Sequence, residues 1–229
     1  MLIFLQYIVK NDNKGEHEML KKILIAAALI GTLGLPLHAQ ETVADAEKYV
    51  IQAAQYYQQG NYAKALEFYN KALAIELKVK GENHPDTAGS YNDIGMVYGS
   101  QGNYAKALEF FNKALVIQLK VLGENHPHTA NSYNNIGMVY GSQGNYAKAL
   151  EFFNKALVIR LKVLGENHPH TAVSHYNIGR VLYDSGKKTE ARDHLRKAAA
   201  IARKTLGPDH PYTKQISEGL QFVENELSK

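Results

Sequence analysis

The chain has 229 residues, of which 45% are apolar and 21% are charged, so it can bury a hydrophobic core of ordinary size. It contains no cysteine, which excludes disulfide bonds, thiolate metal sites and a cysteine nucleophile. Its formal net charge is +4, without the strongly basic stripe that is typical of a nucleic-acid-binding domain.

A segment resembling a secretory signal peptide occupies residues 19–39. Its start is basic, at Lys21 and Lys22, an apolar run follows from Ile23 to Leu35, and Ala39 is a small residue before the expected cut. A helix needs ~20 apolar residues to cross a bilayer, and this run is shorter. We therefore expect cleavage near Ala39 and export, to the periplasm or as a secreted protein. Anchoring in the membrane by an uncleaved signal is the alternative.

Residues 1–18 precede this segment, although a secretory signal is expected at the start of a chain. We interpret them as a misassigned extension and Met19 as the true start. Removing residues 1–39 takes away four of the 26 Lys and Arg residues and three of the 22 Asp and Glu residues, which leaves a slight basic excess.

A period of 42 residues organises the rest of the chain. The segments 81–122 and 123–164 are identical at all but four positions. Glycine and histidine recur at this interval: Gly60, Gly102, Gly144 and Gly186, and His84, His126, His168 and His210. A fixed period in this range indicates an architecture of stacked repeats.

Each period contains two helical patterns separated by a glycine turn. In the second period, the first pattern (helix A) covers residues 86–100 and the second (helix B) covers residues 104–122. Gly102 between them suits the left-handed position that follows a helix. The apolar faces comprise Tyr91, Ile94, Gly95 and Tyr98 on helix A, and Ala107, Leu108, Phe111, Ala114, Leu115, Leu119 and Leu122 on helix B.

These residues occur in an order that resembles the tetratricopeptide repeat (TPR), with tyrosine in place of its usual first tryptophan. The matching positions are Tyr91, Ile94-Gly95, Tyr98, Gly102, Tyr104, Ala107-Leu108, Phe111 and Ala114. Ordinary TPR motifs take ~34 residues. The additional residues fall at the end of helix B and in the loop Gly81-Glu82-Asn83-His84-Pro85. This extended form resembles the repeats of kinesin light chain and its bacterial relatives.

The resemblance implies an all-α fold, a right-handed superhelical solenoid of helix-turn-helix repeats. Residues 44–206 would form four units, at about 44–80, 86–122, 128–164 and 170–206. Residues 207–229 would form a C-terminal capping helix, which carries Ile216, Leu220 and Val223 at helical spacing. The outer units depart from the pattern, as is expected where a repeat faces water on one side.

The recurring loop that contains His84 could also be read as a metal site or a catalytic loop. Metal-binding nitrogens must converge on one ion, whereas equivalent residues of stacked repeats lie ~8–10 Å apart. The chain also lacks a phosphate-binding glycine loop, a nucleophile elbow and the motif His-Glu-x-x-His. We therefore predict no metal, no cofactor and no catalytic residue. The loop is interpreted as a seam between repeats, in which either Asn83 or His84 caps helix A.

Three of the four positions that differ between the two middle repeats lie on one side of helix A. The four differences are Asp86 against His128, Gly89 against Asn131, Asp93 against Asn135, and Gln118 against Arg160. The first three lie at i, i+3 and i+7, opposite the core face of helix A. In the fold that the sequence resembles, that side lines a concave groove. Drift of solvated positions and diversification for a ligand both explain the changes.

The groove hypothesis names nine binding residues: Asn92, Asp93, Met96, Asn134, Asn135, Met138, Tyr176, Asn177 and Arg180. A ladder of Asn92, Asn134 and Asn177 could hold a peptide backbone, because asparagine both donates and accepts hydrogen bonds. Methionine would provide an adaptable apolar floor. In kinesin light chain such grooves take aromatic and acidic peptides with the help of basic residues. That preference is not carried over, because the middle repeats have no Lys or Arg on this face.

The sequence therefore predicts a non-enzymatic scaffold of the cell envelope that binds extended peptide segments of a protein partner. The partner is unidentified, and neither nucleic acid nor a stable membrane span is expected after signal cleavage. Two alternatives remain: a regulatory subunit that occludes a partner enzyme, and a structural spacer that associates with itself.

Overall fold

The computed structural model describes residues 42–229, so the expected signal peptide and the extension before it lie outside the described residues. Within residues 42–229 the chain forms nine α-helices and no strand. The helices are α3 (Val43–Gln58), α4 (Tyr62–Val79), α5 (Pro85–Ser100), α6 (Tyr104–Val121), α7 (Pro127–Ser142), α8 (Tyr146–Leu164), α9 (Pro169–Asp184), α10 (Lys188–Leu206) and α11 (Pro211–Leu227).

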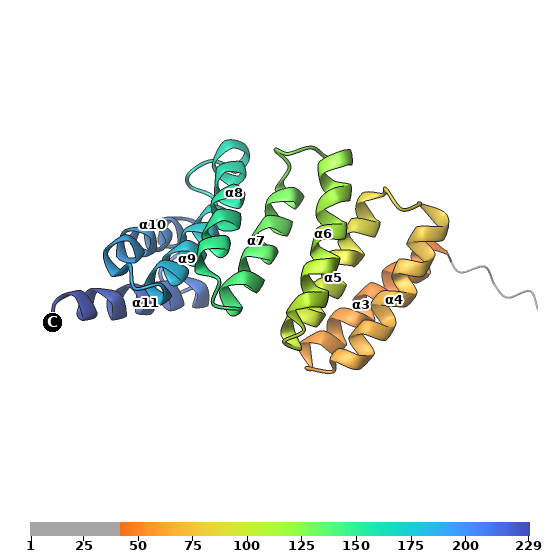
Figure 1. Ribbon diagram of the computed structural model, residues 1–229, viewed down its shortest axis with the longest axis horizontal. Helices are drawn as coiled ribbons and strands as arrows, with labels where there is room; N and C mark the ends of the chain where they lie inside the picture. Colours follow the sequence, from red (N-terminus) through yellow and green to blue (C-terminus); the bar gives the residue numbers. More distant parts are fainter. Residues whose placement is uncertain (1–41) are drawn as a thin grey trace, which may run out of the picture. The chain divides into compact units, whose positions relative to one another are not determined.

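The helices pack as four successive pairs followed by one last helix (Figure 1). The A helices are α3, α5, α7 and α9, and each packs against the B helix that follows it, α4, α6, α8 or α10. Each B helix of the first three pairs also packs against the A helix of the next pair, and α10 packs against α11. This arrangement is the all-α solenoid that the sequence predicts.

The turn within each pair depends on a glycine. Gly102 has a φ of 74°, in the left-handed region that side chains other than glycine rarely adopt. The side chain of Asn103 then accepts a hydrogen bond from the backbone N–H of Lys106 and caps α6. Asn61 and Asn145 cap α4 and α8 in the same way.

The loop between pairs ends one helix and caps the next. His84 has extended backbone, as expected for a residue before proline, and its Nδ1 accepts a hydrogen bond from the backbone N–H of Asp86. Thr87 Oγ1 donates a 2.9 Å hydrogen bond to the carbonyl of Gly81, which ties the loop to the helix. The structure thus selects His84 over Asn83 as the cap. The equivalent caps are His126, His168 and His210.

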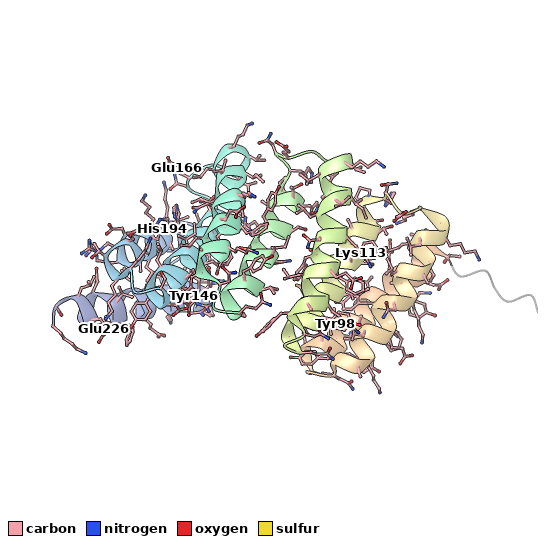
Figure 2. The ribbon with its side chains drawn as sticks, in the orientation of Figure 1. Tyr98, Lys113, Tyr146, Glu166, His194 and Glu226 are labelled. Carbon is pink, nitrogen blue, oxygen red and sulfur yellow. The ribbon has the colours of Figure 1, made fainter. Side chains whose placement is uncertain are left out.

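In each of the first three pairs, a tyrosine of the A helix stacks on a phenylalanine of the B helix. In the second pair, Tyr98 stacks on Phe110 with ring centroids 5.5 Å apart, and Lys106 Nζ lies 4.9 Å from the Tyr98 ring. Lys113, which is labelled in Figure 2, lies on the same helix. Its Nζ is 4.9 Å from the ring centroid of Phe110. The tyrosines at these positions therefore pack between helices, as the motif predicts, and are not free in the groove.

The last helix covers the end of the solenoid. Ile216 and Val223 of α11 are buried, and Leu220 packs beside them against the alanine-rich surface of α10. Ion pairs surround this contact, between Arg196 and Glu224 and between Lys188 and Glu226. The helix α11 therefore has the packing expected of a cap, because it shields the apolar side of α10 from water.

Candidate functional site

Six side chains of the A helices form a continuous surface, named here the A-helix face: Asp93, Met96, Asn135, Met138, Asn177 and Arg180. All six are exposed or half-buried, although they alternate with fully buried neighbours such as Ile94 and Ile136. Two pockets lie on this face, one between α5 and α7 and one between α7 and α9.

The pocket between α5 and α7 is mainly apolar and has a volume of about 240 Å³. Its lining includes Met96 and Met138, with Gly99 contributing space because it has no side chain. Tyr57 reaches across from α3 and closes one side, where its hydroxyl is 2.9 Å from Ser100 Oγ. Asn135 also lines this pocket, so it has an apolar floor with a polar amide at its edge.

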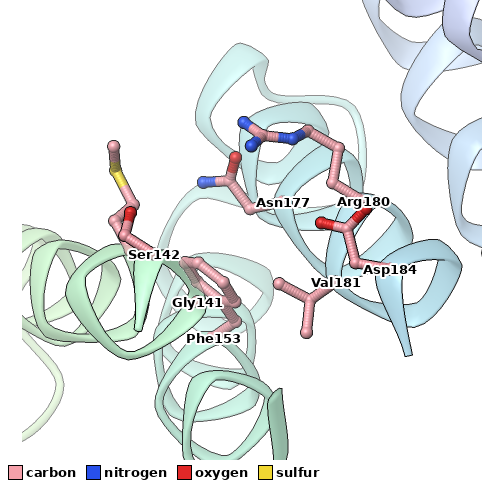
Figure 3. Close-up of a pocket in the computed structure, with 8 residues that line it drawn as sticks. Gly141, Ser142, Phe153, Asn177, Arg180, Val181 and Asp184 are labelled. Atoms are coloured by element: carbon pink, nitrogen blue, oxygen red, sulfur yellow. The ribbon is translucent and has the colours of Figure 1, made fainter. Parts of the chain in front are cut away.

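The pocket between α7 and α9 is more polar and has a volume of about 260 Å³. Figure 3 shows Asn177, Arg180 and Asp184 along one side, on α9, and Gly141 and Ser142 on the opposite side, on α7. Met138 lines both pockets, so the two pockets are neighbours along the A-helix face. Asp184 also lines this pocket and was not among the predicted binding residues.

Four of the nine residues named by the groove hypothesis line neither of these pockets: Asn92, Asp93, Asn134 and Tyr176. The three other than Asp93 make contacts within the fold. The side chain of Asn92 donates a hydrogen bond to Ser132 Oγ, which lies on the next A helix. Asn134 is buried, and its Oδ1 accepts a 2.9 Å hydrogen bond from Asn177. Tyr176 lies against the capping helix, where it contacts Tyr212 edge-on. These contacts link successive A helices and orient the A-helix face.

Asp93 is the only one of the nine that is acidic, and its surroundings are unusual. Among the described residues it has no hydrogen-bond donor and no ion-pair partner. Burial, and after it the negative charge of Glu76, raises the pKa of the Asp93 carboxyl to about 7. Asp86 on the same helix differs, because it forms an ion pair with Lys80.

One buried position behind the A-helix face was not predicted from the sequence to be part of the site. Equivalent positions of successive B helices carry Glu76, Gln118, Arg160 and Ala202, and all four are buried. Gln118 Oε1 accepts a 2.7 Å hydrogen bond from Ser132. The difference between Gln118 and Arg160 was visible in the sequence, but the apolar stripe around it gave no indication that a polar side chain was enclosed there.

Arg160 is a buried cation that has no carboxylate partner among residues 42–229. Its guanidinium donates hydrogen bonds to the His170 carbonyl, to Ser174 Oγ at 2.8 Å and to Asn131 Oδ1 at 3.0 Å. Burial lowers its pKa to about 10, so it stays charged at neutral pH. Asn131 replaces Gly89 of the preceding repeat, so two of the four differences between the middle repeats are in direct contact.

A metal-ligand cluster and a membrane-spanning helix are two further features to consider in the described part of the chain. His126 and His128 stack with centroids 5.2 Å apart, but residues 42–229 contain no cluster of three or more ligands that could hold a metal ion. No helix in the same range has the length and apolar character needed to cross a bilayer.

The fold and its A-helix face define a helical repeat protein with two neighbouring pockets on that face. The family model described as Tetratricopeptide repeat matches residues 45–120, 90–160 and 128–204, which together cover more than half of the chain. The chain therefore belongs to the tetratricopeptide repeat family. No curated protein matches it significantly.

Three solved structures illustrate the similarity. BtubC (BKLC) from P. vanneervenii has a TM-score of 0.72 and 24% identity over 81% of this chain and 74% of that one. The nearly identical TPR-like repeats of a putative kinesin light chain from Podosopora anserina have a TM-score of 0.64 and 25% identity, over 82% and 94%. A Rap protein complexed with Competence and Sporulation Factor has a TM-score of 0.67 and 19% identity, over 80% and 49%. The resemblance to kinesin light chain repeats predicted from the sequence is thus confirmed.

Proposed function

We propose that the protein is a non-enzymatic scaffold that binds an extended peptide segment of a partner protein along the A-helix face. One observation carries this proposal: two adjacent pockets share Met138 and are lined by side chains from four successive A helices. An extended peptide is the ligand whose backbone can contact equivalent positions of successive repeats. The Rap structure gives the fold-level precedent that a TPR solenoid is found complexed with another factor.

We also propose that the scaffold acts in the cell envelope, which rests on the basic and apolar pattern of residues 19–39. Protein sequencing of the exported chain is expected to give an N-terminus at Gln40. Material that retains the apolar run from Ile23 to Leu35 would instead support the anchored alternative.

The groove is tested by recovering partners from envelope extract on the immobilised protein. We expect that Met96→Lys together with Met138→Lys abolishes specific recovery, because both side chains lie exposed in the pockets and a lysine would put charge on their apolar floor. The matched control is Val116→Lys with Val158→Lys, since these valines are exposed on the B helices, at 64% and 62%. Equal recovery by the groove variant and the control would contradict the proposal.

Sedimentation velocity over a range of concentrations separates this function from a self-associating spacer. A protein that stays monomeric while it binds its partner is a scaffold in the proposed sense. The alternative outcome is assembly that increases with concentration and that the Met96 and Met138 substitutions abolish. That outcome would mean that the A-helix face mediates self-association.

A further inference from the structure

The A-helix face changes charge from one repeat to the next. At one position, α5 carries the acidic Asp93, whereas α7 and α9 carry the neutral Asn135 and Asn177. At a second position, α5 and α7 carry Met96 and Met138, whereas α9 carries the cationic Arg180. At these two positions, α5 therefore carries an acidic residue, α7 no charge and α9 a basic residue.

The buried position behind this face follows the same order. Glu76 lies behind α5, Gln118 behind α7 and Arg160 behind α9, because each B helix packs against the A helix of the next repeat. Glu76 leaves one carboxylate oxygen, Oε2, without a hydrogen bond, and no carboxylate neutralises Arg160 among the described residues. Burial weakens the screening of these charges by water. Each has the same sign as the charged residue on the face in front of it. Burial also raises the pKa of Glu76, and burial together with the Glu76 charge raises the pKa of Asp93.

The two charges on the face itself are not neutralised by the fold. Among residues 42–229, Asp93 meets no cation, and Arg180 meets no carboxylate within ion-pair distance. Arg180 lies 6.0 Å from the ring centroid of Tyr176, which holds the guanidinium over the face without cancelling its charge. Asp184 lies one helical turn beyond Arg180 in the same pocket and forms no ion pair with it.

We infer that the groove recognises a bipolar segment, which places a basic side chain beside Asp93 on α5 and a carboxylate beside Arg180 on α9. This inference rests on the proposed peptide-binding function and adds the chemistry and direction of the ligand. The complementary charges fix the direction, because the reversed placement would bring like charges together at both ends.

The spacing of the two charges on the ligand follows from the repeat. Neighbouring packed helices lie ~8–10 Å apart, so Asp93 and Arg180, two repeats apart, are separated by roughly 16–20 Å. An extended chain rises ~3.3 Å per residue, which places the two charged residues of the ligand about five or six positions apart. The residues between them would meet Met96, Met138 and the amide of Asn135.

The titration of Asp93 links binding to pH. Burial and Glu76 raise its pKa to about 7, and a basic side chain beside it would favour the charged form. Tyr69 also faces this carboxyl and carries no charge near neutral pH. Binding is therefore expected to release a proton from Asp93, and affinity is expected to rise as the pH rises through about 7.

Each of the two charges can be removed by one substitution, to the residue that another repeat has at the same position. Asp93→Asn reproduces Asn135 and Asn177, and Arg180→Met reproduces Met96 and Met138. Glu109→Gln is the control, because this exposed carboxylate lies on the B helix α6, where it pairs with Lys113. Circular dichroism and urea unfolding of each variant establish that it is folded before binding is measured.

The experiment selects ligands from a library of random 12-residue peptides displayed on phage. The wild type and the control are expected to enrich peptides with a basic and an acidic residue about five or six positions apart. The Asp93→Asn variant should no longer select a basic residue in the peptide but should still select the acidic one. The Arg180→Met variant should no longer select an acidic residue but should still select the basic one. For a selected peptide, fluorescence anisotropy at low salt should show each substitution weakening Kd about 5-fold or more.

The outcomes separate this inference from the proposed function. If both variants enrich the same charged pattern as the wild type, the bipolar ligand is wrong, whereas the peptide-binding groove stands. If the wild type enriches no peptide at all, both proposals are wrong. Enrichment of uniformly acidic peptides would also overturn the inference, because Asp93 would then face a like charge.

Discussion

At the residue scale, the A helix α7 contains two glycines with different roles, Gly137 and Gly141. A Cβ on Gly137 would lie 2.8 Å from a ring carbon of Phe153, so this glycine allows α7 and α8 to pack closely. A Cβ on Gly141, one turn later, would meet Val181 at 3.5 Å, which is an ordinary contact. Gly141 instead leaves open the pocket between α7 and α9.

This contrast predicts opposite effects of the same substitution. Gly141→Ala should raise the free energy of unfolding by ~0.5–1 kcal/mol, because alanine loses less conformational entropy than glycine in a helix. Gly137→Ala should lower it by ~1–3 kcal/mol, because the ring of Phe153 must move. Urea unfolding of the two variants measures both values. A destabilised Gly141→Ala would show that this glycine is needed for packing and not for the groove.

At the element scale, the contact between α7 and α8 explains why two differences between the middle repeats occur together. Arg160 requires a hydrogen-bond acceptor from α7, and Asn131 provides it. The preceding repeat has Gly89 and Gln118 at these positions, and Gln118 is satisfied by Ser132. The pair Asn131 and Arg160 is therefore one structural change and not two independent ones.

Replacing one member of this pair should lower the free energy of unfolding more than replacing both with the residues of the preceding repeat. Asn131→Gly leaves part of the buried guanidinium without an acceptor, which should lower the free energy of unfolding by about 1–3 kcal/mol. Adding Arg160→Gln to that variant recreates the contacts of the preceding repeat and should recover most of the loss. A double-mutant cycle from urea unfolding gives the coupling. Additive effects would mean that the contact contributes nothing.

The fourth pair replaces an aromatic contact with two histidines. His175 and His194 stand where Tyr133 and Phe152 contact each other in the third pair, and their Nδ1 atoms are 3.1 Å apart. His194 lies on α10 (Figure 2). Burial, and after it the positive charges of His194 and Lys197, lowers the pKa of His175 to about 4. Burial also lowers the pKa of His194, against the opposing charges of Asp193 and Glu190.

These lowered pKa values predict a loss of stability in mild acid. The unfolded chain binds protons on these histidines near pH 6.5, before the folded chain does. The contribution of these histidines to the free energy of unfolding is therefore complete above about pH 6.5 and falls as the pH drops toward 4. Between pH 7 and 5, the wild type should lose about 2 kcal/mol more than the variant His175→Tyr, His194→Phe, as measured by urea unfolding. Equal losses would mean that other groups control the acid sensitivity.

At the scale of the whole solenoid, the near identity of residues 81–122 and 123–164 predicts that α9 can pack against α6 as it packs against α8. Deleting residues 123–164 would place α6 against α9, where Ser174 can meet Asn92 and Gln118 as Ser132 does now. We expect this shortened chain to fold cooperatively, with the same helical signal per residue by circular dichroism and a smaller denaturant m-value. A shortened chain without a cooperative transition would show that the repeats are not interchangeable.

Much of this architecture could be predicted from the sequence because it depends on local spacing. The 42-residue interval, the glycine turns and the apolar faces of helices A and B predict the helix pairs and the last helix. The helix predicted over 86–100 is observed as Pro85–Ser100. The positions of Asp93, Met96, Asn135 and Met138 on one face also follow from helical periodicity, because side chains three, four or seven residues apart share a side.

The tertiary structure decided which polar side chains are free, because their partners are distant in the sequence. Asn134 follows the same pattern as its exposed neighbours, yet it is buried and bonded to Asn177 from another repeat. Arg160 lies within an apolar stripe, and its burial depends on acceptors from α7 and α9. Helical spacing determines on which side a residue points, whereas burial and electrostatic environment depend on the helices packed against that side.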